Sequence, residues 1–421
     1  MAIGIGAGGI GGLAFEQLSP PVQSALATAA TGGTITAGTY KYVVTAINTN
    51  GETTASNEQT IVTTGSTSTV TVTWAAVVGA TGYKLYKTAA GGATGTELLY
   101  KTVGAVTSDI DTSPGSPAGA FPAQNTAANS GTYYAPTKFF PFNSESLVVQ
   151  QDTIWRRPIR QNADVIGAVA GNYHVEGDLD MESLEDVIAY FLYASRTSIA
   201  KTGTSPNFTY TFTPTSAAVP VRTLSLTFVR NGLVFGYTGC VTSSFTFGIA
   251  DGILTFNTSM MGRDEAVQSL PTPTWPTTTP FGAGMFKIEI PTGTQVFDTD
   301  TFEFAVEDNA EAQFRLKDTG RGAQFMKFGE RNSTMNMERD FEARTDYDLF
   351  KSVTSQSVTL TATKGVNNNI VILAPVAIKD TFEVGLSGQG DIVRASIAYQ
   401  NVIDSTGKSW QITLKTQEDI L

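Results

Sequence analysis

The stretch Asp180–Arg196, DMESLEDVIAYFLYASR, carries the one long helical pattern in a chain whose other segments alternate like strands. Asp180 is placed to cap this helix, acidic residues crowd its first turn, and Arg196 closes its last turn. Large apolar residues recur along one face at helical spacing, at Leu184, Val187, Ile188, Phe191 and Leu192. A lone amphipathic helix among strands has to bury that face on a sheet. We therefore expect these residues to pin a β-sandwich or half-barrel.

The charge balance of the chain narrows its possible partners. Its 421 residues suggest two or three domains, and only 15% of them are charged, against a usual share of about 25%. Acidic residues number 38 and basic residues 27, which gives a net charge of -11. Tight nucleic-acid binding requires clustered Lys and Arg, and the sequence has no such cluster.

The chain contains one cysteine and one histidine, which excludes sites that need two or more of either residue. Cys240 cannot form an internal disulfide, and His174 cannot build a multi-histidine metal centre. We expect a buried role for Cys240 and a structural role for His174. The sequence contains no apolar run of membrane-spanning length and no secretion signal at its start, so we expect a protein made and assembled in a cytoplasm, with no membrane partner and no cofactor.

The first residues contain a glycine pattern that resembles a nucleotide-binding motif. Gly4, Gly6 and Gly9 match G-x-G-x-x-G, but only three residues precede the motif, and the double proline Pro20-Pro21 soon follows. A dinucleotide site needs a buried strand before the motif and a helix after it. We therefore interpret residues 1–33 as a flexible arm belonging to the first module of the fold.

Residues 34–122 alternate in short strands separated by turns. The positions predicted to face the core are Tyr40, Tyr42, Val44, Ala46, Val70, Val72, Trp74, Tyr83, Leu85 and Tyr86. The motifs Y-x-Y-x-V-x-A-x-N-x-x-G-E, V-x-V-T-W and A-T-G-Y-x-L-Y resemble a fibronectin type III or bacterial immunoglobulin-like domain. The tyrosine strands precede the tryptophan strand, which departs from the usual order of that family. Trp74 lies in an alternating strand and is expected in the core rather than on a sugar.

The rest of the chain contains two pairs of segments with similar patterns, as in an internal repeat. Residues 169–188 and 328–353 each read as a strand, an acidic stretch and a helix start, the second with Thr345 and Asp348 as a capping box. Residues 239–264 and 374–404 each read as a strand pair across a glycine turn. We interpret this as a duplication.

The duplication sets the predicted domain boundaries. We expect a first module over residues 123–270, a linker over 271–284 and a second module over 285–421. The linker contains LPTPTWPTTTPFGAG, which is rich in proline and threonine.

Four motifs of the second part resemble siphophage major tail tube proteins, from non-contractile tails. They are F-x-P-F-N-S-E-S-L at Phe139–Leu147, the G-x-x-x-x-G-x-L-D-M strand before the helix, T-G-C-x-x-x-S-F-x-F, and S-G-x-G-D-I-V at Ser387–Val393. The resemblance covers roughly residues 128–421 and includes no catalytic signature. In that family a short glycine-containing arm is followed closely by a T-x-F-F-P strand, as Gly11–Gln17 and Thr137–Pro141 would be if joined. The immunoglobulin-like domain would then be an insertion displayed outward.

The resemblance implies a mainly β fold of two tail-tube-type sandwich or half-barrel modules, each with one flanking helix. It implies a non-enzymatic virion protein that forms rings stacked into a tube for DNA ejection. Rings of the family hold six modules, so two modules per chain imply a homotrimeric pseudo-sixfold ring, and one module implies a homohexamer. Further partners would be the tape measure, terminator and distal tail proteins. The genome would pass through the lumen without specific binding.

The resemblance also directs attention to particular residues. An acidic wall repels phosphate and lets DNA slide, and the candidate lumen acids are Glu176, Asp178, Asp180, Glu338 and Asp340. Trp155, Arg156 and Arg157 form a small basic and aromatic spot that we expect at a contact between subunits. Long loops such as Ser144–Val165, and the N-terminal arm, would bridge rings.

Three other functions compete with this hypothesis. An extracellular adhesin or carbohydrate-binding β-sandwich protein would carry ligand sites on its modules. A β-sandwich glycosidase or lyase would use paired carboxylates such as Asp178 and Asp180, although acids at a helix start need no catalytic explanation. A baseplate, capsid-decoration or contractile-tail inner tube protein would belong to a virion as well, and the sequence separates it poorly from the first hypothesis.

Overall fold

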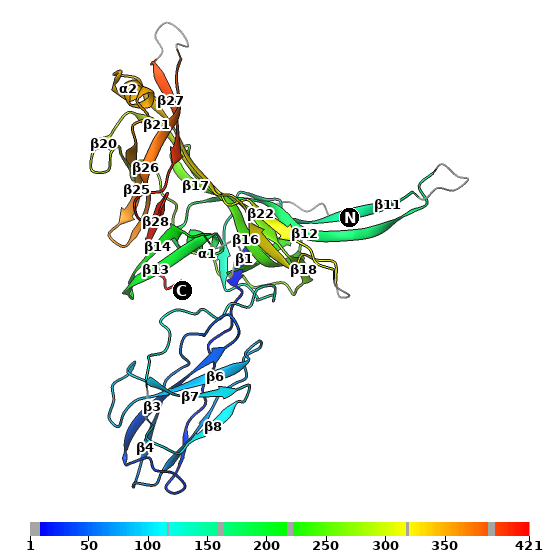
Figure 1. Ribbon diagram of the computed structural model, residues 1–421, viewed down its shortest axis with the longest axis vertical. Helices are drawn as coiled ribbons and strands as arrows, with labels where there is room; N and C mark the ends of the chain where they lie inside the picture. The colour runs from blue at the N-terminus through cyan, green and yellow to red at the C-terminus, as the bar shows by residue number, and fades with distance from the viewer. Residues whose placement is uncertain are drawn as a thin grey trace. The chain divides into compact units, whose positions relative to one another are not determined.

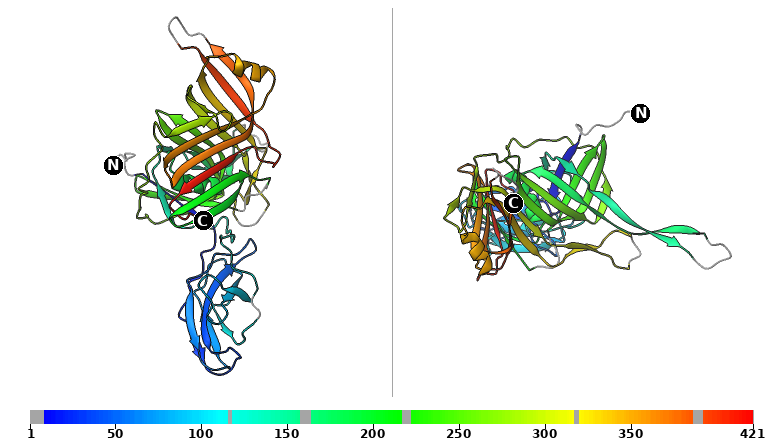
Figure 2. Two further views of the ribbon diagram at one scale, coloured as in Figure 1. Left: turned by 90° about the vertical axis from the view of Figure 1, so that its left-hand side faces the viewer. Right: turned by 90° about the horizontal axis from the view of Figure 1, so that it is seen from above.

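The computed structural model describes residues 9–115, 118–157, 164–216, 222–316, 320–385 and 392–420. The first eight residues, with Gly4 and Gly6, and residues 387–391 of the Ser387–Val393 motif lie outside this description. The chain divides into two compact units, unit 1 with Met1–Phe15 and Gly131–Ile420, and unit 2 with Glu16–Ser130 (Figures 1 and 2). Both units consist mainly of antiparallel strands. Neither helix in the described part of the chain has the length and hydropathy of a membrane span.

Unit 2 is built from two antiparallel sheets. One sheet has the order β4 (Gln59–Thr63), β3 (Gly38–Ile47), β6 (Gly82–Lys87) and β7 (Leu98–Gly104). The other has the order β2 (Ala27–Ala29), β5 (Thr69–Thr73) and β8 (Ser108–Asp111).

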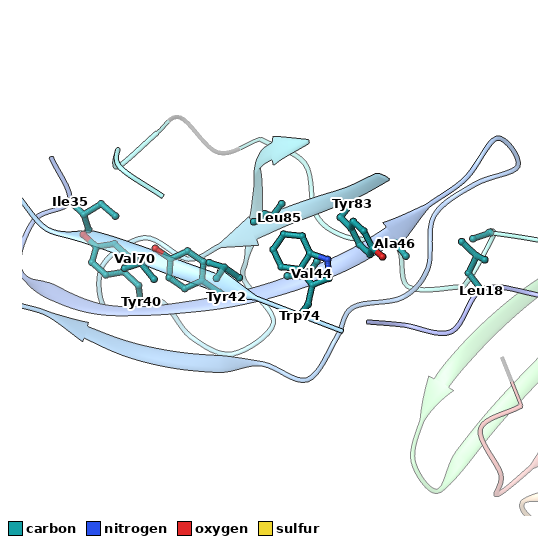
Figure 3. Packing of buried hydrophobic residues seen from close by; sticks show 12 residues of the cluster. Leu18, Ile35, Tyr40, Tyr42, Val44, Ala46, Val70, Trp74, Tyr83 and Leu85 are labelled. Atoms are coloured by element: carbon teal, nitrogen blue, oxygen red, sulfur yellow. The ribbon is translucent and has the colours of Figure 1, made fainter. Parts of the chain in front are cut away.

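The core of unit 2 lies between side chains of these two sheets (Figure 3). Every residue that the alternation predicts to face inward is buried, and Trp74 is only 2% exposed, with its ring 5.2 Å from that of Tyr83. The prediction of a core Trp74 is therefore confirmed. A buried ion pair also joins the sheets, because Lys87 Nζ lies 2.7 Å from Asp111 Oδ2, which in turn accepts a hydrogen bond from the Tyr42 hydroxyl.

Unit 1 contains a long antiparallel sheet whose neighbours follow the order β11, β12, β17, β16, β21, β24, β27, β26. Alternating Phe, Val, Met and Thr along these segments gives each strand one apolar and one polar face. The strands are β11 (Val148–Arg156), β12 (Gly167–Glu182), β17 (Ile253–Gly262), β16 (Leu233–Ala250), β21 (Thr299–Glu307), β24 (Asn332–Asp340), β27 (Arg394–Asn401) and β26 (Asn368–Gly385).

The same order of pairings occurs in both halves of unit 1. The first half of β16 pairs with β15 (Leu224–Arg230) and β18 (Asp264–Val267), and β15 continues to β1 (Ile10–Phe15) and β9 (Lys138–Phe140). The first half of β26 pairs with β25 (Gln356–Gly365) and β28 (Gln411–Thr416), and β25 continues to β19 (Phe286–Glu289) and β20 (Gln295–Val296). The echoing ranges 169–188 and 328–353 fall on β12 with α1 and on β24 with α2.

Three short elements complete unit 1. The hairpin β13 (Thr197–Thr204) and β14 (Asn207–Pro214) pairs with β28 of the second half. The hairpin β22 (Ala310–Gln313) and β23 (Phe325–Phe328) follows β21, and β10 (Ser144–Glu145) pairs with the end of β12. The predicted long loop Ser144–Val165 is wrong over Val148–Arg156, because strand pairing with β12 extends that segment as β11.

The first helix, α1 (Glu185–Tyr193), is shorter than predicted. Asp180 does not cap it: Asp180 lies in β12 opposite Ser144 and Asn257, where the ladder uses the backbone, and the N-cap is Leu184 without a side-chain hydrogen bond. Glu182 also belongs to β12, and Arg196 lies beyond the C-cap Ala194.

Burial of α1 is complete rather than limited to one face. The five predicted apolar residues are at most 2% exposed, and all nine helical residues, including Glu185 and Asp186, are buried. Buried carboxylates need partners. Glu185 receives hydrogen bonds from Lys364 Nζ at 2.6 Å and Asn368 Nδ2 at 2.6 Å, both in the second half of unit 1.

The segment predicted as a linker takes part in this packing. Asp186 Oδ2 lies 2.8 Å from Lys138 Nζ of β9 and accepts a hydrogen bond from Thr278 Oγ1 at 2.9 Å. Phe281 is fully buried, and Lys364 Nζ lies 4.3 Å from its ring centre. Residues 278–281 therefore help to hold α1 rather than only connecting two halves.

The second helix, α2 (Thr345–Lys351), is short and contains no buried residue. The predicted capping box of Thr345 and Asp348 is wrong, since the N-cap is Arg344 and makes no side-chain cap hydrogen bond. Arg344 instead pairs with Asp348 at 3.2 Å in an exposed i, i+4 ion pair. The α2 helix lies beside β26 and β27 near one end of the sheet (Figure 1).

Candidate functional site

The eight-stranded sheet of unit 1 has one buried and one exposed face. On β12, Val175, Leu179 and Met181 are buried, whereas Glu176 and Asp178 between them are exposed. The same alternation continues across the sheet, and the rings of Phe245, Phe304 and Trp410 meet on the buried side. The other side is left open to water over most of the sheet, except at Val241 and Met261, which the β22–β23 hairpin covers.

This exposed surface, which we call the acidic face, carries carboxylates from both halves of unit 1. The register places Asp178 next to Ser259, then Ser244, then Glu307, so the rows cross from one half to the other. A second row runs from Glu182 through Thr255 and Gly248. The acids of the face are Glu176, Asp178, Asp180, Glu182, Glu303, Glu307, Glu338, Asp340 and Glu383.

Small neutral residues fill most positions between the acids. Among the register positions of the acidic face on β17, β24 and β27 are Thr255, Asn257, Ser259, Thr334, Asn336, Ser396 and Ala398. Arg394 is the basic residue of β27 on this face, and it pairs with Asp300 and Asp340. The acidic face is therefore negatively charged, and the guanidinium of Arg394 is already paired with two carboxylates.

All five predicted acids lie on this face. Glu176, Asp178 and Asp180 come from β12, and Glu338 and Asp340 come from β24. Prediction from sequence missed Glu303 and Glu307 of β21, although the segment TFEFAVE alternates plainly and could have revealed them. It also missed Glu383, which the register places beside Ser396.

Two of these carboxylates are held by neighbouring side chains of the sheet. Asp178 Oδ1 accepts a hydrogen bond from Ser259 Oγ at 2.6 Å, and Glu176 Oε2 lies 3.2 Å from His174 Nε2. In the described part of the chain, no three His, Cys, Asp or Glu side chains are placed to hold a metal ion. Cys240 is fully buried, which confirms the expected location. Exposed like charges on a wall repel a polyanion and give it no specific contact.

The strands β11 and β12 continue beyond the sheet as a two-stranded ribbon (Figure 1). We call it the arm. Trp155 is 61% exposed on β11, and Arg156 and Arg157 are exposed beside it. Further exposed apolar side chains of the arm are Ile154, Val165, Ile166 and Val169. These apolar side chains are divided between the two faces of the ribbon, because successive strand residues point to opposite sides. Exposed apolar side chains gathered on a ribbon are typical of a surface that another chain covers.

The sheet ends in two strands with open edges. Within the described residues, β11 pairs with β12 alone. The segment of β26 after Ala377 pairs with β27 alone, because β25 and β28 pair only with earlier residues of β26. Open edges of an antiparallel sheet are templates for another strand.

An ionic cluster around the buried Asp308 joins the two halves of unit 1. Arg331 Nε lies 2.6 Å from Asp308 Oδ1, and Asp308 Oδ2 accepts the backbone N–H of Arg196 at 3.3 Å. Burial raises the pKa of Asp308, and the Arg331 guanidinium opposes that rise. Arg196 Nη1 donates to the carbonyl of Gly329 at 2.8 Å. The end of α1 is thereby tied to the start of β24.

Comparison with known families identifies the chain. A family model described as phage tail tube protein matches residues 96–400. A search of curated proteins found no match.

Proposed function

The chain belongs to the phage tail tube protein family, and we propose that three copies close each ring of its tube. Membership makes the chain a structural, non-enzymatic component of the virion tail that assembles with itself into a tube. The finer proposals concern the number of modules, the closure of the ring, the lumen, the arm and unit 2. Each is supported by contacts within unit 1 or by the sheets and core of unit 2.

The recurring order of pairings supports two tube modules per chain. Strands β11, β12, β17 and β16 correspond to β21, β24, β27 and β26, and each set contributes four neighbours to the long sheet. The join between the sets, β16 to β21, is an ordinary antiparallel ladder. A second chain could repeat that join at the free edges, with β26 in the place of β16 and β11 in the place of β21.

Ring closure would then remove both open edges. Three chains of eight strands would supply a barrel of 24 strands, and barrel closure leaves no unpaired edge to aggregate. Three chains with two modules each would supply the six modules that a ring of the family holds. The hexamer remains the alternative if only one module of each chain lines the ring.

The acidic face is the surface we assign to the lumen. It is the exposed face of the very strands that would form the barrel, and its acids come from both modules. Negative charge facing the channel would repel the phosphates and keep duplex DNA mobile. Tight binding gains its free energy when Lys and Arg neutralise phosphates and release counterions, and an acidic wall offers no such groups. Passage of the genome would then need no specific binding.

The arm is the element we assign to contacts between subunits and between rings. Its apolar side chains around Trp155 are exposed, and Arg156 and Arg157 add charge beside them. Stacking of identical rings is a heterologous contact that continues into a filament. The ends of such a filament would meet the tape measure, terminator and distal tail proteins.

Unit 2 is the segment we assign to an immunoglobulin-like insertion of a siphophage tail tube. Its two sheets and buried tyrosines and tryptophan support a sandwich of that type. The compact segment Glu16–Ser130 is wider than the predicted 34–122, and its ends lie together, since Asn129 N–H donates to Glu16 O at 2.8 Å. Removing Glu16–Ser130 and joining the ends with a short linker should leave tube assembly intact.

Cysteine pairs at the open edges test the ring. One cysteine replaces Gln150 on β11, and the other replaces Thr381 or Glu383 on β26, all on the acidic face. The native Cys240 is buried and can stay. In a matched control the second cysteine replaces Asn257 of β17, an exposed position whose strand is paired on both sides.

Oxidation of assembled tubes should give covalent products that end at three chains on a denaturing gel. A ladder that continues to six chains would contradict the trimer, and no product above background from the edge pairs would contradict closure through β11 and β26.

A further inference from the structure

The two helices of unit 1 follow corresponding strands but differ in burial. Helix α1 follows β12 and is buried on every side, whereas α2 follows β24 and has no buried residue. The two strands that precede the helices, β12 and β24, pair with corresponding neighbours in the two halves, β17 and β27. The difference therefore lies in what covers each helix from outside its own half.

The cover over α1 comes in good part from the second half of the chain. Glu185 is held by Lys364 and Asn368, which flank the turn between β25 and β26. The helix also packs on β26 and β28. The helix of one half thus rests on the outer strands of the half that follows it.

The corresponding outer strands of the first half are β15, β16 and β18. Strand β15 is itself buried, with Tyr133 and Tyr134 bonded to Thr227 and Ser225, but apolar side chains stay exposed at the turn that follows it and on β18. Leu233, at the turn between β15 and β16, is 65% exposed, and Val267 of β18 is 93% exposed. Among the described residues, β18 pairs only with β16, while its counterpart β28 pairs with both β26 and β14. Leu233 and Val267 are therefore exposed at the place in the first half that corresponds to the surface on which α1 packs in the second half.

The surroundings of α2 are equally incomplete. Tyr347, Phe350 and Phe382 form a ring cluster, with Phe350 and Phe382 stacked at 6.0 Å, and Val353 at the helix end is 66% exposed. An open hollow of about 450 Å³ lies beside α2, and its lining is part apolar and part polar: Phe350, Lys351, Val353, Ile378, Lys379, Asp380 and Gln400. Half-buried aromatic side chains beside a hollow are suited to apolar contact with another chain.

We propose that α2 of one copy packs on the turn between β15 and β16 and on β18 of the next copy in the ring. The contact repeats, between chains, the packing of α1 on the second half within a chain. It rests on the proposed ring closure, because pairing of β26 with the next β11 is what brings the next β15, β16 and β18 under α2. It adds a second, apolar contact to the strand ladder.

Amide hydrogen exchange of the full chain, as monomer and as assembled tube, tests this contact. Assembly should slow exchange in β11, in residues 378–385 of β26, in α2 and in β18, and should leave the core strands β3 and β6 of unit 2 unchanged. If the two edges become protected while α2 and β18 do not, the ring closure stands and the α2 contact is wrong. If the edges gain no protection either, the ring closure itself has failed.

Two variants sharpen the test on the receiving surface. Leu233→Asp and Val267→Asp place a charge on exposed positions, so the monomer should fold with unchanged Tm. Burial of an unpaired charge in the contact should raise the protein concentration needed for tubes roughly tenfold or more. Val78→Asp is the matched control, because Val78 is an 83% exposed apolar residue of unit 2. Normal assembly of both variants would overturn the proposal.

Discussion

The helices α1 and α2 occupy corresponding positions in the two halves of unit 1, and only α1 has a complete environment. Its acids are paired with Lys364 and Lys138, and its apolar residues are fully buried. The α2 helix is attached through Asp346, which lies 2.6 Å from Lys379 Nζ and 2.9 Å from Arg339 Nη1, and through its half-buried aromatic rings. Helix α1 is thus covered by residues of its own chain, and we propose that α2 is covered by a second chain.

The largest expected effect comes from a charge in the buried helix. Phe191→Asp should prevent unit 1 from folding, because Phe191 is fully buried among rings that include Phe140 and Phe256. Loss of the ring alone costs about 3–5 kcal/mol, and an unpaired buried charge adds several more. Far- and near-UV circular dichroism of the full chain measures this. The counterpart Phe350→Asp should leave a folded monomer that fails to assemble, and equal unfolding by both changes would remove the distinction between the helices.

A smaller effect is expected from breaking the ion pair that covers α1. Lys364→Met leaves Glu185 buried without its cation and should lower the free energy of unfolding by about 3 kcal/mol or more. Denaturant melts followed by tryptophan fluorescence measure the loss. The double variant with Glu185→Gln should recover part of it. A Lys364→Met protein as stable as the parent would mean that the hydrogen bond from Asn368 alone is enough to hold Glu185.

The attachment of α2 should respond to pH. Burial lowers the pKa of Lys379, and Asp346 opposes that shift. A base whose pKa is lower in the folded state binds fewer protons there, so this group makes the protein more stable as pH rises from the folded pKa toward the unfolded value of about 10.4. Asp346→Asn removes the opposing carboxylate and should steepen that rise, measured as Tm between pH 7 and pH 10. A flatter profile than the parent's would contradict the assignment.

The smallest effect belongs to the surface of α2. Arg344→Ala removes an ion pair with Asp348 in which both side chains are mostly exposed, and pairs of this kind contribute about 0–0.5 kcal/mol. Its denaturation midpoint should match the parent's within error. Comparison of Lys364→Met with Arg344→Ala distinguishes a buried ion pair that links the two halves from an exposed ion pair that contributes little to stability.

Much of this architecture can be predicted from alternation alone. The core of unit 2, the burial of Leu184 to Leu192 and the acids of β12 and β24 all follow from a period of two or from helical spacing. The start of α1 could not be predicted, because Asp180 resembles a cap until its register opposite Asn257 is known. The pairing of Glu185 with Lys364 spans 179 positions and depends on the packing of one half on the other, which no local pattern encodes.

The central claim is that each chain supplies two modules and that three chains complete a ring. Cryo-electron microscopy of assembled tubes, with class averages viewed down the axis, tests it most directly. We expect threefold symmetry, three copies of unit 2 per ring, and a lumen wall formed by the acidic face. Six copies of the chain in each ring would contradict the claim.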